Sequence, residues 1–205
     1  MKEKIIEILL STGRAGMDKL VQHMEEMGFF EAPCSTRFHL AKEGGLAEHS
    51  YNVYRVAKDL SFLMEMDGEP LAKEAEDSII ICSLLHDLGK AGQFGKPGYV
   101  PKMCKGRVTK ANPNPEPYQS TSQPFESNPK LLCVDHEIRS IQIASQFINL
   151  TEEENWAILM HNGMYSSFRY QLQGKETPLY LILHTADMWA SRVLEKEATE
   201  DAEVS

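Results

Sequence analysis

The chain has 205 residues and a formal net charge of -9, and its 42% hydrophobic and 25% charged content is that of an ordinary globular protein with one sizeable core. No apolar run approaches the roughly 20 residues that cross a bilayer, and the amino terminus does not read as a secretory signal, so we expect a cytoplasmic protein without a membrane partner. A net negative surface repels phosphate backbones, which argues against general nucleic-acid binding.

The first part of the chain predicts helices. Residues 1–37 contain two segments of helical apolar spacing, which we interpret as accessory helices packed on the same domain as the rest. That domain is expected to cover residues 38–195. Its first helix follows Gly45 and is strongly amphipathic, so that His49 faces the core. A second helix is predicted from about Leu71 to Asp87.

A long loop is predicted next. Within residues 91–130 the apolar periodicity gives way to glycine, proline, asparagine and serine, and residues 112–117 cannot form a helix or a central strand. A hairpin around Tyr99 to Val108 is one alternative for part of this loop. Between Lys90 and Pro115 the chain carries six basic residues and no acidic one. This basic insertion is either a solvated loop or a segment that collects an anionic substrate.

Helices resume at His136, where Asp135 occupies the position of a capping residue. A capping box beginning at Thr151 predicts another helix, which leads to His161.

The last helix begins at Thr177, a cap residue followed by a proline, and runs to about Glu195. On it, Asp187 shares a face with Ser191 and Leu194. Residues 196–205 form an acidic tail. The chain is therefore expected to be all-α, a helical bundle with a long irregular loop.

Metal-binding donors lie within or at the ends of these predicted helices, and a helical bundle can bring such residues to a central cavity. Imidazole and carboxylate donors together suit borderline metals such as Fe, Mn, Zn, Ni or Co. A single core histidine is more often a hydrogen-bonded core residue than a ligand. A buried carboxylate such as Asp187 needs a partner, which a metal, Arg192 or His184 could provide. The candidate ligands are His49, His86, Asp87, His136, His161 and Asp187.

Three segments carry most of these donors: Gly44-Gly45-Leu46-Ala47-Glu48-His49-Ser50, Leu84-Leu85-His86-Asp87-Leu88-Gly89-Lys90 and His184-Thr185-Ala186-Asp187. They resemble the motif blocks of the HD-domain superfamily of metal-dependent phosphohydrolases. The resemblance covers residues 38–195, and residues 38–46 are similar to the HD domain of certain bacterial 3'-5' exoribonucleases. It implies an HD-domain helical bundle in which His49, His86, Asp87 and Asp187 bind one divalent metal, with a second held by Asp87, His136 and His161. The ions could be Fe, Mn, Ni, Co, Zn or Mg.

The chain departs from the related HD-GYP phosphodiesterases at two places. After His161 it has Asn162-Gly163-Met164-Tyr165, where those proteins have a second histidine and a Gly-Tyr-Pro element. Gly45 stands where they have a glutamate four residues before the first histidine. We therefore do not assign a cyclic dinucleotide as the substrate.

The resemblance implies a hydrolase that cleaves a phosphate mono- or diester, of a nucleotide or another small phosphorylated molecule, with a metal-activated hydroxide. Asp87 and Lys90 are the candidate catalytic residues. Lys90 could neutralise charge on the phosphate, or it is simply a cation at a helix C-terminus. Candidate substrate contacts besides Lys90 are His39, Tyr99, Arg107, Arg139, Tyr165 and His184.

Two other functions remain open from the sequence. Mixed-valent di-iron oxygenases that resemble HD proteins use a similar series of ligands, and a non-catalytic nucleotide-binding module would need no turnover at all. The oligomeric state is also open, because the amino-terminal helices could either cover the core or pair two chains in a homo-oligomer.

Overall fold

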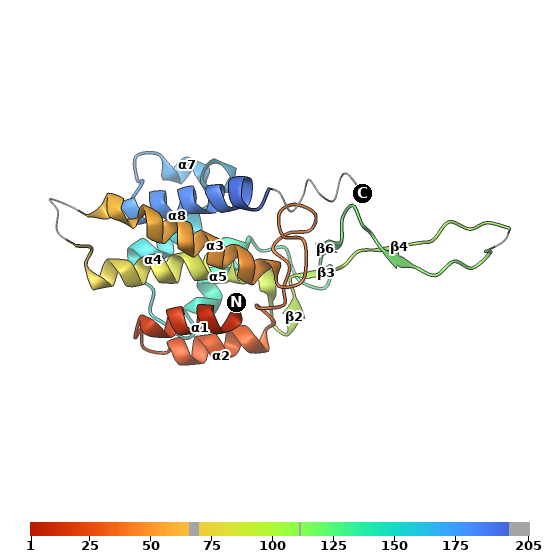
Figure 1. Ribbon diagram of the computed structural model, residues 1–205, viewed down its shortest axis with the longest axis horizontal. Helices are drawn as coiled ribbons and strands as arrows, with labels where there is room; N and C mark the ends of the chain where they lie inside the picture. The colour runs from red at the N-terminus through yellow and green to blue at the C-terminus, as the bar shows by residue number, and fades with distance from the viewer. Residues whose placement is uncertain (66–69, 111, 197–205) are drawn as a thin grey trace.

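The computed structural model describes residues 1–65, 70–110 and 112–196, so most of the predicted acidic tail lies outside the described residues. The fold is mainly helical, as predicted (Figure 1). Within the described parts of the chain, none of the helices combines the length and apolar character that crossing a bilayer requires. The α-helices are α1 (Lys2–Ser11), α2 (Met17–Glu26), α3 (Gly45–Leu60), α4 (Lys73–Leu85), α5 (His136–Ala144), α6 (Glu152–Met160), α7 (Arg169–Leu172) and α8 (Pro178–Trp189).

The helices pack around two clusters of buried apolar side chains. One cluster joins α1 and α2 to the end of α4 and to α5, and the other lies among α3, α4, α6 and α8. In Figure 1 the α1–α2 pair lies along one side of the bundle and α7 with α8 along the other. Helix α4 is shared by both clusters, which explains the mostly apolar sequence before His86: Ile81, Leu84 and Leu85 are fully buried.

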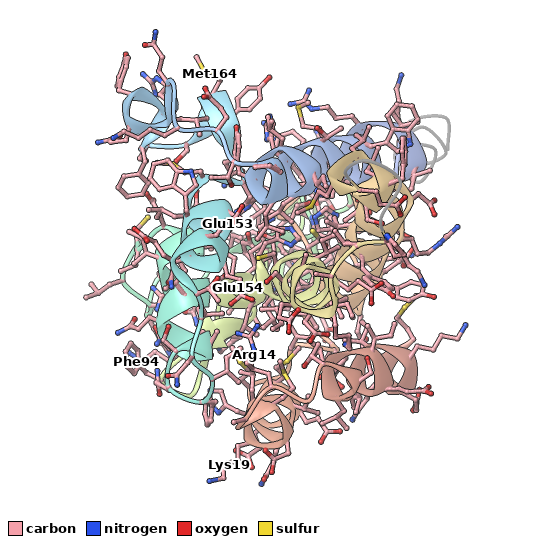
Figure 2. The ribbon with its side chains drawn as sticks, turned by 90° about the vertical axis from the view of Figure 1, so that its left-hand side faces the viewer. Arg14, Lys19, Phe94, Glu153, Glu154 and Met164 are labelled. Atoms are coloured by element: carbon pink, nitrogen blue, oxygen red, sulfur yellow. The ribbon has the colours of Figure 1, made fainter. Side chains whose placement is uncertain are left out.

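A bidentate ion pair ties the amino-terminal segment to the bundle (Figure 2). Arg14, between α1 and α2, donates from Nη1 and Nη2 to the two carboxylate oxygens of Glu154 on α6, over 3.0 and 2.7 Å. Glu154 is buried, and it also accepts from the Ser78 hydroxyl of α4 over 2.8 Å. Three separate parts of the chain therefore meet at one carboxylate.

The predicted starts of two helices are confirmed. Thr151 and Glu154 form a capping box at the start of α6, and Thr177 caps α8 with Pro178 at its first position. Asp135 occupies the N-cap of α5 but makes no capping hydrogen bond with its side chain.

The insertion after the His86-Asp87 doublet is not an irregular loop, and the fold is accordingly not all-α. Strands β1 (Gly92–Gln93) and β2 (Lys96–Pro97) pair with each other, and a longer antiparallel hairpin projects from the bundle (Figure 1). In that hairpin β3 (Tyr99–Pro101) pairs with β6 (Phe125–Ser127), and β4 (Met103–Cys104) with β5 (Tyr118–Gln119). The hairpin thus extends well past Val108, while residues 112–117 form neither helix nor strand, as predicted.

The end of the last helix also differs from the prediction. Helix α8 gives way to a π-helical turn, η4 (Ala190–Leu194), and the Glu195 amide donates to the carbonyl of Ala190, five residues back. A π turn accommodates one extra residue, so the residues after it rotate relative to an α-helix. Glu195 is therefore 3% exposed and Leu194 47% exposed. The sequence predicts that Leu194 shares the face of Asp187, but Glu195 takes the inward position instead.

The backbone that follows His86 and Asp87 lies directly against α5. The 3-10 turn η2 (Leu88–Ala91) packs on α5, and the amide of Gly89 donates to the Ser140 hydroxyl over 2.8 Å. A Cβ at Gly89 would lie 2.3 Å from the carbonyl oxygen of His136. Only glycine allows this contact without movement of the backbone.

We therefore expect Gly89→Ala to destabilise the protein by about 1–3 kcal/mol, the usual cost of forcing an extra group into a packed site. The same displacement should separate His136 from Asp87. Denaturant unfolding and metal titration measure the two effects. A variant with unchanged stability and metal affinity would show that the approach of η2 to α5 is not required.

Candidate metal centre

The six candidate ligands converge from five helices. His49 lies on α3, His86 and Asp87 follow the last residue of α4, and His136 is the first residue of α5. His161 follows α6, and Asp187 lies on α8. Helix ends are well suited to such a centre, because side chains from several helices can meet there without leaving the core.

One half of the cluster forms around His49. Its Nε2 lies 3.2 Å from Asp187 Oδ1 and 3.5 Å from Asp87 Oδ2. Donor atoms of His49, His86 and Asp187 all lie within 4.8 Å of one another. Ligands that bind the same ion at about 2.0–2.2 Å are roughly 3.0–3.5 Å apart, so these separations suit a shared ion.

The other half forms on the opposite oxygen of Asp87. His136 Nε2 and His161 Nε2 lie 3.1 and 3.6 Å from Asp87 Oδ1, and 3.4 Å from each other. His86 Nε2 lies 3.4 Å from Asp87 Oδ2. Asp87 therefore stands between two groups of histidines and offers one oxygen to each.

Several of these donor atoms are buried and lack a hydrogen bond. Among the described residues, His49 Nε2, His86 Nε2 and Asp87 Oδ1 have no hydrogen-bond partner, despite the close approach of His136 to Asp87. Buried polar atoms are nearly always satisfied, and each exception calls for an explanation. Imidazole nitrogen and carboxylate oxygen are ligands of borderline divalent metals. The cluster could therefore hold a metal ion, whose identity the donors alone do not fix.

Backbone carbonyls orient two of the histidines. His86 Nδ1 donates to the carbonyl of Ser83 over 2.9 Å, and His161 Nδ1 donates to the carbonyl of Ile158 over 2.7 Å. A carbonyl can only accept, so the proton lies on Nδ1 and the lone pair of Nε2 faces the cluster. This is the tautomer that metal coordination through Nε2 requires.

Glu195 orients His49, and sequence reasoning missed it. Both of its carboxylate oxygens lie 3.1 Å from His49 Nδ1, and Asn52 Nδ2 donates to Oε1 over 3.0 Å. Burial raises the pKa of Glu195, but the hydrogen bond from His49, the charge of that ring and the hydrogen bond from Asn52 together outweigh burial and hold the pKa below its ordinary value. No sequence signal marks this residue, because the π turn that aims it inward has no recognisable pattern here.

Sequence reasoning also missed Glu137 and Asn162, which lie beside His136. Its Nδ1 is 3.4 Å from Glu137 Oε2, and Glu137 is buried. Asn162 Nδ2 donates to Glu137 Oε1 over 2.7 Å. The adjacent Asn162, which follows His161 in the chain, thus links the two histidines of this half.

The charges of the centre follow from its contacts. Burial raises the pKa of Asp87, but the nearby Lys90 and His86 outweigh burial and hold it well below its ordinary value. Burial lowers the pKa of Lys90, but the surrounding groups, chiefly the Asp87 carboxylate 2.6 Å from its Nζ, together outweigh burial and raise the pKa well above its ordinary value. At neutral pH the centre therefore contains a carboxylate at Asp87 and an ammonium at Lys90.

Three predicted substrate contacts lie at the cluster. Lys90 touches Asp87, and the ring of His39 lies 5.1 Å from that of His49. His184 stacks on Tyr180, and its Nδ1 donates to the carbonyl of His161 over 2.6 Å, so it supports that ligand's backbone.

The other predicted contacts are more spread out. Tyr99 and Arg139 line a cavity of about 230 Å³ together with Lys90 and His136. Tyr165 is exposed beside a second cavity, described below. Arg107 lies on the exposed outer part of the hairpin, between β4 and β5, and the structure does not bring it to the cluster.

Comparisons of the chain with protein-family models, with curated proteins and with solved structures give no match. The buried cluster of histidines and aspartates is compatible with an HD-type site. A functional conclusion must come from the chemistry of the site, because a helical fold by itself serves many functions.

Proposed function

We propose that this protein is a metal-dependent phosphohydrolase of the HD type, which cleaves a phosphate mono- or diester of a nucleotide or another small phosphorylated molecule. The observation that carries the proposal is the set of buried, unpaired donor atoms that face one another: His49 Nε2, His86 Nε2 and Asp87 Oδ1. The HD-like spacing of the motif segments and the helical bundle support it.

In this proposal His49, His86, Asp87 and Asp187 hold one divalent ion, while Asp87, His136 and His161 hold a second. Such a pair of ions supplies a hydroxide nucleophile at neutral pH and polarises a phosphate oxygen. Glu195 and the carbonyls of Ser83 and Ile158 keep the imidazole nitrogens aimed at the ions.

Lys90 is the candidate residue for neutralising charge on the phosphate. Its side chain is 16% exposed, and it lines the small cavity with Tyr99 and Arg139. A fixed cation next to the place where negative charge develops stabilises the transition state, and removal of such a group commonly costs on the order of a hundredfold in rate.

Elemental analysis and an anaerobic assay test the proposal together. Purified protein should contain a stoichiometric transition metal, and with Mn or Mg added it should release phosphate or alcohol from a panel of phosphate mono- and diesters. Removal of the metal by a chelator should stop turnover and lower the melting temperature, since a bound ion stabilises only the folded state. Iron-dependent oxygen uptake without phosphate release would instead indicate a di-iron oxygenase. Nucleotide-induced stabilisation without turnover would indicate a binding module.

Glu195→Gln should weaken metal binding about 10- to 100-fold, because glutamine keeps the shape but removes the charge that makes His49 a stronger donor. Competition with a chromophoric chelator measures the affinity. Glu48→Gln is the matched control, since Glu48 precedes His49 but pairs with Lys42 at the surface over 2.7 Å. Equal affinities in the two variants would contradict the positioning role of Glu195.

A further inference from the structure

A cavity of about 740 Å³ opens on the His49 side of the centre. His39, Ser191 and Glu195 are among the residues that line it. Each of the three contacts a candidate ligand. The His39 ring lies against the His49 ring, and Ser191 Oγ donates to the carbonyl of Asp187 over 2.8 Å. Glu195 accepts a hydrogen bond from His49. The cavity therefore adjoins the part of the centre that His49 and Asp187 form.

Cationic side chains gather around this cavity: Arg37, Arg192 and Lys196 line it. The chain carries 30 acidic and 21 basic residues, so carboxylate partners are plentiful. Even so, within the described residues neither Arg37 nor Arg192 forms an ion pair with a carboxylate. Among the described residues that line the cavity, the one carboxylate is that of Glu195, which accepts hydrogen bonds from His49 and Asn52.

Aromatic rings hold both guanidinium groups in place. Arg37 lies 4.8 Å from the ring centroid of Phe38, and Arg192 lies 5.2 Å from that of Tyr165. A guanidinium that rests on a ring keeps its in-plane N–H groups available, and those groups fit the two oxygens of a carboxylate or phosphate.

We propose that this cavity is a subsite for a second anionic group of the substrate, a phosphate or a carboxylate, separate from the group that reacts. The inference rests on the proposed function. The reacting phosphate would already meet the metal ions and Lys90, so further cations on the His49 side are needed only if the substrate carries another negative charge. The enzyme would then favour substrates with two anionic groups over simple monoesters.

Non-hydrolysable phosphonates test the subsite by binding alone. Calorimetry on the metal-loaded protein would compare methylphosphonate with a series of α,ω-alkane bisphosphonates of increasing chain length. One chain length should bind at least about tenfold more tightly than methylphosphonate, which corresponds to one additional charged hydrogen-bonded contact. Arg37→Gln with Arg192→Gln should abolish this gain and leave methylphosphonate affinity unchanged. ω-Carboxyalkyl phosphonates in the same series distinguish a carboxylate from a phosphate as the second group.

Arg169→Gln is the matched control, because Arg169 also lies over an exposed ring, 4.7 Å from the centroid of Tyr170, but does not line the cavity. This variant should keep the full bisphosphonate gain. If methylphosphonate binds and no bisphosphonate or carboxyalkyl phosphonate binds better, or if the gain survives in the double variant, the subsite is refuted. If methylphosphonate itself does not bind the metal-loaded protein, the failure lies with the proposed phosphohydrolase site.

Discussion

Asp187→Ala is expected to strip the protein of metal at the His49 side and to lower turnover by more than about a hundredfold. Loss of a residue that merely supports a metal ligand costs about 10- to 100-fold, and loss of a ligand should cost more. Asp187 Oδ1 lies 3.2 Å from His49 Nε2, and the side chain is 18% exposed. The apolar contacts of α8 are made by other residues, Leu179, Ile182, Leu183 and Ala186 among them, so the loss of Asp187 should spare the packing of the helix. Elemental analysis, steady-state kinetics and far-ultraviolet circular dichroism measure the three quantities.

Asp59→Ala is a suitable control, because Asp59 is an exposed carboxylate on α3. It should retain metal and activity. An Asp187→Ala protein that is folded, active and fully loaded with metal would remove Asp187 from the set of ligands.

Glu154→Gln is expected to lower the free energy of unfolding by about 3 kcal/mol, which is typical for breaking a largely buried ion pair. The substitution leaves the Arg14 guanidinium without its charged partner (Figure 2). It also weakens the hydrogen bond from Ser78 and the contact with the Thr151 amide, which donates to Glu154 over 2.8 Å. Denaturant unfolding in the presence of a chelator gives the change without a contribution from bound metal.

The effect should depend on pH in a definite direction. Burial raises the pKa of Glu154, but hydrogen bonds from Arg14, Thr151 and Ser78 outweigh it and hold the pKa below the ordinary value of 4.5. A carboxyl group with a lowered folded-state pKa contributes stability that is complete above its unfolded pKa and is lost as the pH falls through the folded value. The gap between wild type and Glu154→Gln should thus be constant near neutrality and shrink below about pH 4.5.

Glu153→Gln is the control for this pair, because Glu153 is the exposed neighbour on the same turn of α6 (Figure 2). Its stability should match that of the wild type at all pH values tested. A Glu154→Gln protein as stable as Glu153→Gln at neutral pH would mean that the Arg14 contact contributes nothing to folding.

The helical framework was predictable from local signals. At the start of α6, Thr151 and Glu154 accept from open backbone amides, and at the start of α8 Thr177 accepts from the Tyr180 amide while Pro178 has no amide hydrogen to satisfy. These groups lie within a few residues of one another, so the sequence alone predicts both helix starts. The proximity of His49, His86 and Asp187 was anticipated for a related reason. Each is followed or preceded by apolar residues at helical spacing, which turns the polar side chain toward the core.

What could not be predicted depends on contacts between distant segments. In the projecting hairpin, Tyr99 pairs with Ser127, and the proline-rich residues between the strands give no tight-turn signal. Arg14 and Glu154 are 140 positions apart. Glu195 reaches His49 only because a π turn shifts the register of the last helix, and the energetic reason for such a turn lies in packing rather than in residue propensity.

The histidines are held in two different ways, so the two halves of the centre should respond differently to truncation of the chain. His86 and His161 each donate to a backbone carbonyl three residues earlier in the chain, so local structure alone orients these two rings. His49 instead is oriented by its hydrogen bond to Glu195, which lies 146 positions later in the chain. Shortening the protein to residue 194 removes Glu195. The half of the centre formed by His136 and His161 should then stay intact, while the His49 ring loses the group that orients it.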